Sequence, residues 1–521
     1  MAGGLMQLVA YGAQDVYLTG NPQITFWKVT YRRHTNFAME SIEQTFNGQA
    51  DFGRRVTCTI SRNGDLAYRT YLQITLPEIN TNHGKYARWL DFPGEQLISQ
   101  VEVEIGGQRI DRQYGDWMHI WNQLTLSKEQ ERGYYKMIGN TTQLTYITDP
   151  DFADVDGPCS ADGVRQVCAP RNALPETTLY VPLQFWYCRN PGLALPLIAL
   201  QYHEVKINLD IRNIEECLWA VKDIGGGGTK ADEAYKQSLA AASLFVDYIF
   251  LDTDERRRMA QNPHEYLIEQ LQFTGDESVG SSSNKIKLNL NHPCKELVWV
   301  VQPDANVDYC ASLQANNQLN KLLGAQPFNY TDAFDVLPNA VHAFGAQGLV
   351  GSDANGMINT GSGGMFVDPF ASEHDPTTSG PTGDSGNNES GVSDAGTFVL
   401  AETALDMHCW GENPVVVAKL QLNGQDRFSE REGTYFDLVQ PFQHHTRAPD
   451  TGINVYSFAL RPEEHQPSGT CNFSRIDNAT LQLVLSNATV SGVNTAKVRV
   501  YAVNYNVLRI MSGMGGLAYS N

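Results

Sequence analysis

The sequence predicts an all-β protein made of two antiparallel β-sandwiches in tandem, with a few short helices and long surface loops. Its 521 residues exceed the roughly 100–200 residues of one ordinary domain, so at least two domains are expected. Apolar and polar residues alternate with a period of two in many segments, whereas helical patterns are few. Segments of the first half also recur in the same order in the second half. Together these observations favour a duplicated β fold.

Strands are predicted where apolar side chains occupy every second position between turns rich in Gly, Pro and Asn. One apolar and one polar face is typical of half-buried strands in antiparallel sheets, and the turns between them indicate sandwiches. The alternating apolar positions are Val56, Cys58 and Ile60; Leu72, Ile74 and Leu76; Val101, Val103 and Ile105; Val205, Ile207, Leu209 and Ile211; Ile286, Leu288 and Leu290; and Leu481, Leu483 and Leu485.

One amphipathic helix is predicted in the first half. Trp117, Trp121 and Leu124 stand at positions i, i+4 and i+7, which places them on one face of a helix. A second helix is predicted to begin after Asp252, a candidate N-cap with Glu255 three residues on. This second helix is expected to connect the two sandwiches.

The two halves have similar sequence patterns at three places. The segments "VEVEIGGQRIDRQYGDW" and "VVVAKLQLNGQDRFSEREGTYF" each read as a strand, a tight turn and a charged stretch that ends in aromatic residues. Next, "PGLALPLIALQYHEVKINL" and "PSGTCNFSRIDNATLQLVL" each read as a turn-rich lead-in to a strand, and "LFVDYIFL" and "VRVYAVNYNVL" close the halves. Three matches in the same order indicate duplication.

Two stretches interrupt this pattern. Residues 339–396 are dominated by Gly, Ser, Asp, Asn and Thr, and "DIGGGGTKADEA" near Gly225 is a smaller example. Segments so poor in core-forming residues are expected to be exposed loops, the longer one belonging to the second domain.

The charge balance argues against direct binding to nucleic acid. The chain has 38 Lys and Arg and 58 Asp and Glu, so its formal charge is 38 − 58 = −20. Affinity for phosphate backbones depends on basic side chains that displace counterions, so an acidic surface repels them. The nine cysteines are scattered without a CxxC pair, which favours a reducing compartment. No signal peptide or membrane-spanning segment is predicted, so we expect a soluble protein made in the cytosol.

No catalytic, metal-binding or cofactor-binding site is predicted. The segment "GGGGTK" lacks the spacing of a phosphate-binding loop, and HExxH is absent. His444 and His445 are adjacent in the chain, and we interpret them as structural histidines with satisfied hydrogen bonds. The segment "GDSGN" resembles a serine-protease nucleophile segment, but it lies within residues 339–396, where nothing would hold an oxyanion hole rigid.

Asn-x-Ser/Thr triplets supply weak candidates for glycosylation. Asn388, Asn329 and Asn140 are the candidates, with Asn388 favoured because of its place in the predicted loop. Such triplets arise by chance in a chain rich in Asn, Ser and Thr.

Long segments spread over the whole chain resemble one protein family. They are "GGLMQLVAYGAQDVYLTGNPQITFWKVTYRRHTNFAMESI", "ISRNGDL", "EIGGQRID", "PGLALPLIALQYHEVK", "VDYIFLD", "PHEYLIEQLQFTG", "KLQLNGQDRF", "QPSGTCNFSRIDNATL" and "NYNVLRIMSGMGGLAYSN". In these segments the sequence is similar to the major capsid proteins of the nucleocytoplasmic large DNA viruses, especially those that infect algae. The similarity fails mainly over residues 81–93, 141–173 and about 305–400, so it supports the scaffold and not the outer surface.

The resemblance implies a double jelly roll, with eight strands in each half. Its expected parts are an N-terminal arm (1–26), a first jelly roll (27–251), a connector (252–263), a second jelly roll (264–511) that carries the exposed insertion 339–396, and a C-terminal tail (512–521).

The resemblance also implies partners. Three chains are expected to form a homotrimer with a nearly hexagonal outline, and such capsomers are expected to tile an icosahedral shell. The partners are then neighbouring capsomers, minor capsid and penton proteins and, through the N-terminal arm, inner-membrane-associated proteins. The expected location is the outer shell of the virion, after assembly in the host cytoplasm.

A jelly-roll carbohydrate-binding protein is the alternative interpretation. Jelly rolls often bind sugars, and Trp117, Trp121, Trp186, Trp299 and Trp410 could supply aromatic surfaces. This alternative predicts an exposed aromatic platform. A jelly-roll enzyme ranks lower, because no convergent carboxylates or metal ligands are evident.

Overall fold

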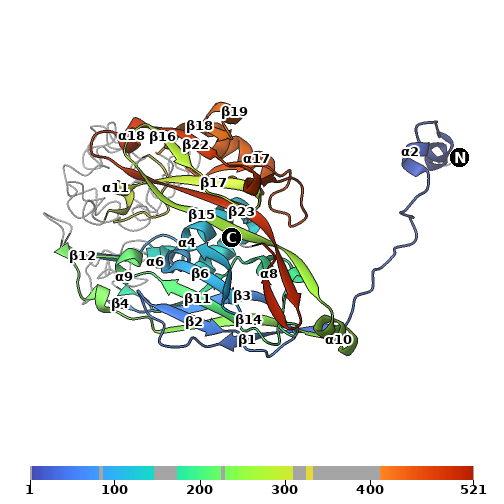
Figure 1. Cartoon of the computed structure of the whole chain (residues 1–521), viewed down its shortest axis with the longest axis horizontal. Coiled ribbons are helices and arrows are strands. Elements are labelled where there is room, and N and C mark those ends of the chain that lie inside the picture. The colour runs from blue at the N-terminus through green and yellow to red at the C-terminus, as the bar shows by residue number, and fades with distance from the viewer. Residues whose placement is uncertain are drawn as a thin grey trace, which may run out of the picture.

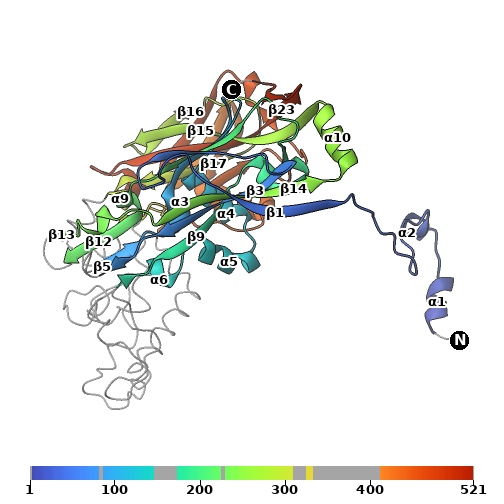
Figure 2. The ribbon, with the colours of Figure 1, turned by 90° about the horizontal axis from the view of Figure 1, so that it is seen from below.

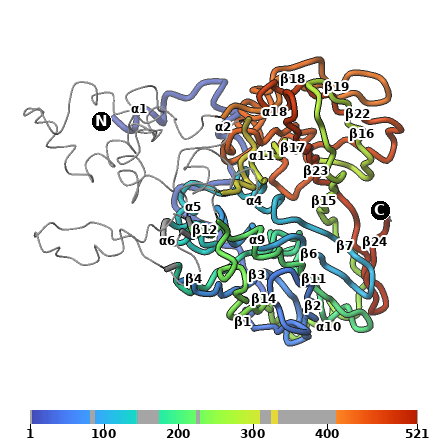
Figure 3. The backbone as a smooth tube through the Cα atoms, turned by 90° about the vertical axis from the view of Figure 1, so that its left-hand side faces the viewer, coloured from blue at the N-terminus to red at the C-terminus, as the bar shows by residue number. Residues whose placement is uncertain are grey.

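The computed structural model describes residues 3–80, 86–145, 173–223, 229–308, 324–332 and 411–519. Two sandwiches lie side by side, with the first half of the chain below the second in Figure 1 and again in Figure 3. The predicted loop over 339–396 lies outside the described residues. In the described part of the chain, no helix is both long enough and apolar enough to cross a bilayer.

The first sandwich consists of two antiparallel sheets. One has the order β1-β14-β3-β10, with β9 also paired to β3, and the other has the order β2-β11-β6-β7. The strands of the first sheet are β1 (Phe37–Gln44), β14 (Ala241–Leu251), β3 (Leu66–Leu76), β10 (Leu195–Pro196) and β9 (Thr177–Pro182); those of the second are β2 (Arg55–Thr59), β11 (Val205–Ile211), β6 (Ile98–Ile105) and β7 (Gln108–Tyr114).

The second sandwich repeats this plan. Its sheets have the orders β15-β23-β17-β20 and β16-β22-β18-β19, with β21 paired to β17 and β24 to β23. The strands are β15 (His264–Val279), β23 (Ala496–Met511), β17 (Pro293–Pro303), β20 (Asn454–Ser457), β21 (Cys471–Asn472), β24 (Met514–Leu517), β16 (Ser283–Lys287), β22 (Ala479–Leu485), β18 (Val415–Leu422) and β19 (Gln425–Glu432).

The two sandwiches match strand for strand in chain order. In each half, the first strand pairs with the last long strand (β1 with β14, β15 with β23). The second strand pairs with the sandwich strand that precedes this last one (β2 with β11, β16 with β22). This is the Greek-key arrangement of a jelly roll, so the predicted double jelly roll is confirmed. The short lead-in strands β10 and β21, which pair with β3 and β17, occupy corresponding places and extend the eight-stranded plan.

Small sheets and short helices lie outside the two sandwiches. The small sheets join β13 (Thr229–Lys230), β12 (Leu218–Asp223) and β5 (Tyr86–Trp89), and β4 (Ile79–Asn80) with β8 (Ala173–Leu174). The helices are α1 (Gly3–Val9), α2 (Val16–Thr19), α3 (Pro93–Leu97), α4 (Gly115–Thr125), α5 (Lys128–Ile138), α6 (Thr142–Thr145), α8 (Trp186–Arg189), α9 (Ile214–Cys217), α10 (Thr253–Gln261), α11 (Asp304–Val307), α17 (Gln440–His444) and α18 (Asn487–Val490). In addition, η1 (Pro191–Leu193), η2 (Ala234–Lys236) and η4 (Phe473–Arg475) are short 3₁₀ helices, and η3 (Tyr435–Val439) is a π-helix that continues into α17.

The period-two alternation predicted the cores correctly. Every alternating apolar position named above is buried, and these residues fill one core in each half. One detail differs, because β16 ends at Lys287, so Leu288 and Leu290 lie beyond the strand yet remain buried. Both predicted helices are present as α4 and α10, and Asp252 caps α10 by accepting a hydrogen bond from the Thr253 N–H (2.8 Å).

The second half reaches into the first through its longest strands. Ile268 of β15 and Leu508 and Ile510 of β23 belong to the core of the first jelly roll. The chain after β23 turns back as β24, and there the Gly515 N–H donates to His203 Nδ1 (3.1 Å). Residues 512–519 are therefore packed against the first jelly roll.

Corresponding glycines start the helix after the second hairpin strand of each half. A Cβ added to Gly115 would lie 2.2 Å from the carbonyl oxygen of Ile98, the first residue of β6. A Cβ added to Gly433 would lie even closer to the carbonyl oxygen of Val415, the first residue of β18. Only glycine fits this approach of two backbones, so the duplication extends to single residues.

We expect Gly115→Ala to lower the free energy of unfolding by about 1–3 kcal/mol, because the added methyl group forces α4 away from β6. Gly133→Ala is the matched control. Gly133 lies within α5 with nothing within 4 Å of its would-be Cβ, so alanine there should be neutral or stabilise by about 0.4–1 kcal/mol. Chemical denaturation of both variants measures the difference, and equal stabilities would contradict the proposed backbone contact.

Candidate assembly surfaces

An apolar contact through α4 joins the two jelly rolls. Trp117, Ile120, Trp121 and Leu124 of this helix are buried against the second half. They pack on the outward face of the sheet that contains β17, β20 and β23, together with residues 328–330. The partners in the second half are Val298, Val300, Phe328, Tyr330, Ile453, Val455, Tyr501 and Val503. The face of α4 that the sequence predicts as apolar thus holds the halves together.

An ion-pair network flanks this contact. Asp116, next to the start of α4, pairs with Arg212 of the first half (3.1 Å) and with Arg499 of β23 (3.0 Å). Arg499 also pairs with Asp276 of β15 (2.9 Å). Burial alone would lower the pKa of Arg499, but the Asp116 carboxylate and its other neighbours raise it above its usual value. Arg499 therefore stays charged and fixes the orientation of β23 on α4.

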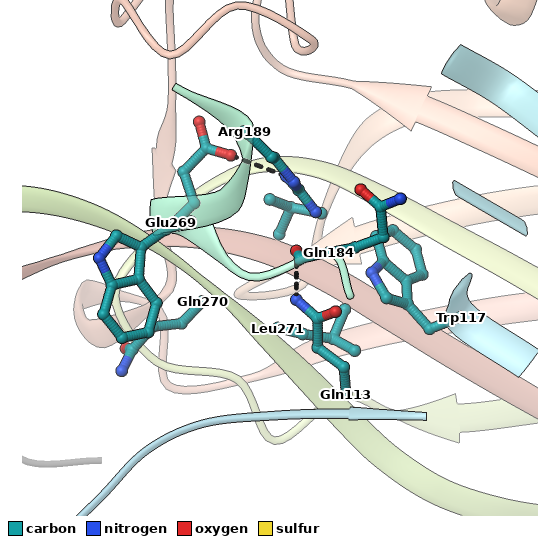
Figure 4. A pocket seen from close by; sticks show the side chains of 9 residues that line it. Gln113, Trp117, Gln184, Arg189, Glu269, Gln270 and Leu271 are labelled. Atoms are coloured by element: carbon teal, nitrogen blue, oxygen red, sulfur yellow. Dashed lines mark hydrogen bonds and ion pairs between the residues drawn. The ribbon is translucent and has the colours of Figure 1, made fainter. Parts of the chain in front are cut away.

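A second polar cluster lies around Glu269 of β15 (Figure 4). Its carboxylate pairs with Arg189 from the first half (3.1 Å), and with Lys295 (2.7 Å) and His465 (3.3 Å) from the second. The Arg189 guanidinium also lies 4.0 Å from the centre of the Trp121 ring. Burial raises the pKa of Glu269, but the hydrogen bond from His465 and the charges of Lys295 and Arg189 lower it to about 2.

The hollow beside this cluster is small. Gln113, Trp117, Arg189 and Glu269 line it, and its cavity volume is about 10 Å³. Small-molecule sites typically measure about 300–1,000 Å³. Its lining also belongs to the contact between the halves, so we interpret it as part of that junction.

His445 has the structural role that the sequence predicts. Its two ring nitrogens face Glu296 and Glu463, each at 2.9 Å. Burial lowers the pKa of His445, but the Glu296 and Glu463 carboxylates raise it to about 9. His444 is engaged differently, with Nδ1 3.2 Å from the carbonyl oxygen of Leu460.

The N-terminal arm is an exposed apolar segment. Residues 3–36 extend away from the body before β1 begins at Phe37 (Figures 1 and 2). Its exposed large apolar side chains are Leu5, Met6, Leu8, Val9, Tyr11, Val16, Tyr17, Leu18, Ile24, Phe26, Trp27, Val29 and Tyr31. The arm (1–26) together with residues 27–36 carries Lys28, Arg32 and Arg33 against Asp15, so the formal charge of the whole stretch before β1 is 3 − 1 = +2 in a chain of −20. Contiguous exposed apolar surface of this extent marks an interaction site.

Four of the tryptophans proposed for a sugar-binding platform are buried. Trp117 and Trp121 lie in the junction between the jelly rolls, Trp186 in the first core and Trp299 in the second. The expectation of an exposed platform is therefore wrong for these four residues, because they fill space between sheets. Trp410 lies outside the described residues.

Two of the three candidate glycosylation residues are described. Asn329 donates to Gln326 Oε1 (2.8 Å) and accepts from the Thr331 N–H (3.0 Å), so its side chain is engaged within the fold. The Asn140 side-chain oxygen accepts from the Phe92 N–H (3.3 Å). Asn388 lies outside the described residues. Glycosylation stays a prediction for all three.

Two family models together match most of the chain. The model described as "Major capsid protein N-terminus" matches residues 25–252, and the one described as "Large eukaryotic DNA virus major capsid protein" matches residues 255–516. The chain belongs to the major capsid proteins of large eukaryotic DNA viruses. The resemblance inferred from the sequence segments is therefore confirmed, and the molecule is a structural protein of a viral capsid.

Known capsid proteins match along their whole length. The chain is 87% identical to the major capsid protein of Phaeocystis pouchetii virus and 41% identical to that of Paramecium bursaria Chlorella virus 1, in both cases over 100% of each chain. The solved "PBCV-1 virus capsid, quasi-atomic model" is similar with a TM-score of 0.62 and 34% identity, over 95% of this chain and 100% of that chain. The Faustovirus major capsid protein shares the fold at 13% identity, with a TM-score of 0.61 over 98% of this chain and 96% of that chain.

Glu269→Gln should destabilise the capsid chain by about 3–5 kcal/mol, because it leaves the buried charge of Lys295 without its partner. Wild-type stability gained from Glu269 is fully present above its unfolded pKa near 4.5 and falls as pH drops toward 2. Unfolding measured between about pH 2 and about pH 6, a window that spans this range, should show that slope in the wild type and a weaker slope in the variant.

The control for this prediction is Glu265→Gln on the same strand. Glu265 pairs with Arg509 at 2.8 Å, but both side chains are more than half exposed. Such surface pairs contribute about 0–1 kcal/mol. An equal loss of stability in the two variants would show that burial of the Glu269 cluster is not the cause.

Proposed function

We propose that three copies of this chain form a homotrimer whose six jelly rolls make a nearly hexagonal capsomer, and that such capsomers tile an icosahedral outer shell. The supporting observation is the duplication itself. Two sandwiches with the same strand order are joined in one chain by the α4 contact. A three-fold assembly of such a chain presents six similar edges to its neighbours.

The strength of contacts should differ between levels of assembly. Obligate subunit interfaces typically bury more than ~2,000 Å² with an apolar centre, and we expect this within the trimer. Contacts between capsomers should be smaller and more polar, so that misplaced capsomers can dissociate. We further propose assembly in the host cytoplasm and a role without catalysis. Within the described residues no three His, Cys, Asp or Glu side chains are grouped to hold a metal ion.

We also propose that the N-terminal arm contacts neighbouring capsomers, minor capsid and penton proteins or inner-membrane-associated proteins. Its large apolar side chains are exposed, so the described part of the body leaves them uncovered. Residues 27–36, directly after the arm, carry Lys28, Arg32 and Arg33 and no acidic side chain, which favours binding of this stretch to acidic protein surfaces, including that of another copy. Direct binding to nucleic acid is disfavoured by the overall charge of −20.

Light scattering on the purified protein tests the trimer directly. We expect a molar mass near three times the chain mass of 57.8 kDa, stable to dilution into the low micromolar range. A monomer at every concentration would contradict the capsomer proposal.

Deletion of residues 1–26 should leave trimers intact and impair their assembly into larger lattices, because the arm lies outside both jelly-roll cores. Light scattering reports the trimer, and electron microscopy of assembly mixtures reports the lattice. A full-length chain with Val493→Ser provides a control, since it removes an exposed apolar side chain outside the arm. Loss of trimers in the truncated protein would oppose this division of roles.

A further inference from the structure

The duplication places a second helix at the position of α4. In the second half, η3 and α17 follow β19 as α4 follows β7, and the helix starts at Gly433 as α4 starts at Gly115. Counting from these glycines, Ile120, Trp121 and Leu124 correspond to Leu438, Val439 and Phe442. Apolar character is therefore kept at each of the three positions.

These corresponding residues differ in burial. Ile120, Trp121 and Leu124 are covered by the second jelly roll. In contrast, Leu438 is 55%, Val439 39% and Phe442 85% exposed. The helix 433–444 thus leaves exposed the apolar residues at the three positions that α4 uses to hold the halves together. The nearby Leu460, whose carbonyl oxygen contacts His444, extends this exposed apolar surface.

The surface that receives α4 also has a counterpart. In the second half, Tyr501 stacks on Phe273 with ring centres 4.9 Å apart, and Trp117 of α4 covers Tyr501 at 5.4 Å. In the first half, Tyr71 of β3 stacks on Phe245 of β14 at 5.3 Å, on the outward face of the corresponding sheet.

Among the described residues, no helix buries this first-half face as α4 buries its counterpart. Tyr71 and Phe245 are only partly buried. The ring centre of the neighbouring Tyr180 lies 6.2 Å from that of Tyr71, and Tyr180 is 40% exposed. We call Tyr71, Phe245 and Tyr180 the open aromatic face. Like the surface that α4 covers, it carries a stacked aromatic pair on the outward face of its sheet.

The two uncovered surfaces cannot meet within one molecule. The helix with α17 lies in the upper half of Figure 1, beside β18 and β19, whereas β14 and β1 lie at the bottom of the lower half. A head-to-tail contact between two copies would bring the helix of one onto the aromatic face of the other. Such contacts close into a ring when the rotation between successive copies is a whole fraction of a full turn.

We propose that the helix 433–444 of one copy docks on the open aromatic face of the next copy, in the manner in which α4 docks within the chain. This inference rests on the proposed trimer and names its interface. Around the ring, three contacts within chains would alternate with three contacts of the same kind between chains. Thr434 stands where α4 has Asp116, which pairs with Arg499 within the chain. The contact between copies therefore has no equivalent of that ion pair and relies on apolar packing.

The helix side is tested with Phe442→Asp in the full-length chain. A charge placed in an apolar interface removes at least ~2 kcal/mol, so the concentration at which half the trimers dissociate should rise at least about 30-fold. Val493→Asp is the matched control, because Val493 is 95% exposed and lies away from this helix in the sequence. Its trimer should be unchanged. The thermal unfolding of dissociated Phe442→Asp should resemble that of the wild type.

The receiving side is tested with Tyr180→Asp, which should weaken the trimer to a similar degree although it lies in the other jelly roll. Should either aspartate variant misfold, Leu438→Ser and Tyr180→Ser give milder changes with the same expected direction. Mass photometry over a dilution series measures all of them.

The outcomes separate the interface from the trimer. If the wild type is a trimer and both Phe442→Asp and Tyr180→Asp form equally stable trimers, the proposed interface is wrong. The proposal of a trimeric capsomer would still stand. A monomeric wild type would overturn both. If the variants trimerise normally but fail to form lattices, the helix serves contacts between capsomers or with a minor capsid protein, and the proposed occupant is wrong.

Discussion

The packing of α4 on the second jelly roll is the contact on which the rest of the structure depends. Without it, the outward faces of β17, β20 and β23 would expose a row of apolar side chains, which is unfavourable in water. The helix buries them and adds the Asp116 pairs at its N-terminal end. The two jelly rolls thereby behave as one block with a fixed angle between them. A shell built from identical blocks needs that fixed angle.

The polar contacts of the junction contribute more to geometry than to stability. Buried ion pairs such as those around Glu269 recover little net free energy, because both charges lose their hydration. They are, however, directional, and Glu269 joins Arg189 of the first half to Lys295 of the second. The long strands β15 and β23 add an apolar contact between the halves, since Ile268, Leu508 and Ile510 lie in the first core. Several independent contacts thus determine one arrangement.

Duplication and divergence can be separated in this chain. Gly115 and Gly433 are kept because a backbone carbonyl leaves no room for a Cβ at either site. Side chains that face outward have diverged, as at Asp116 and its counterpart Thr434. The core positions hold the jelly roll, and the outward positions determine what each copy of it contacts. The apolar arm and the basic residues 27–36 that follow it also lie outside both cores, in an otherwise acidic chain.

The sequence by itself predicted many of the long strands, the helices α4 and α10 and the duplicated order, because those depend on local periodicity and capping. It also predicted that His445 would be structural. It did not reveal that Trp117 and Trp121 bury at the junction, or that Arg189, Glu269 and Lys295 meet there. These contacts join residues such as Arg189 and Glu269 that are 80 positions apart, and no local pattern encodes such a pairing. Which apolar faces are covered and which stay open was decided only by the tertiary structure, since burial depends on what lies opposite each face.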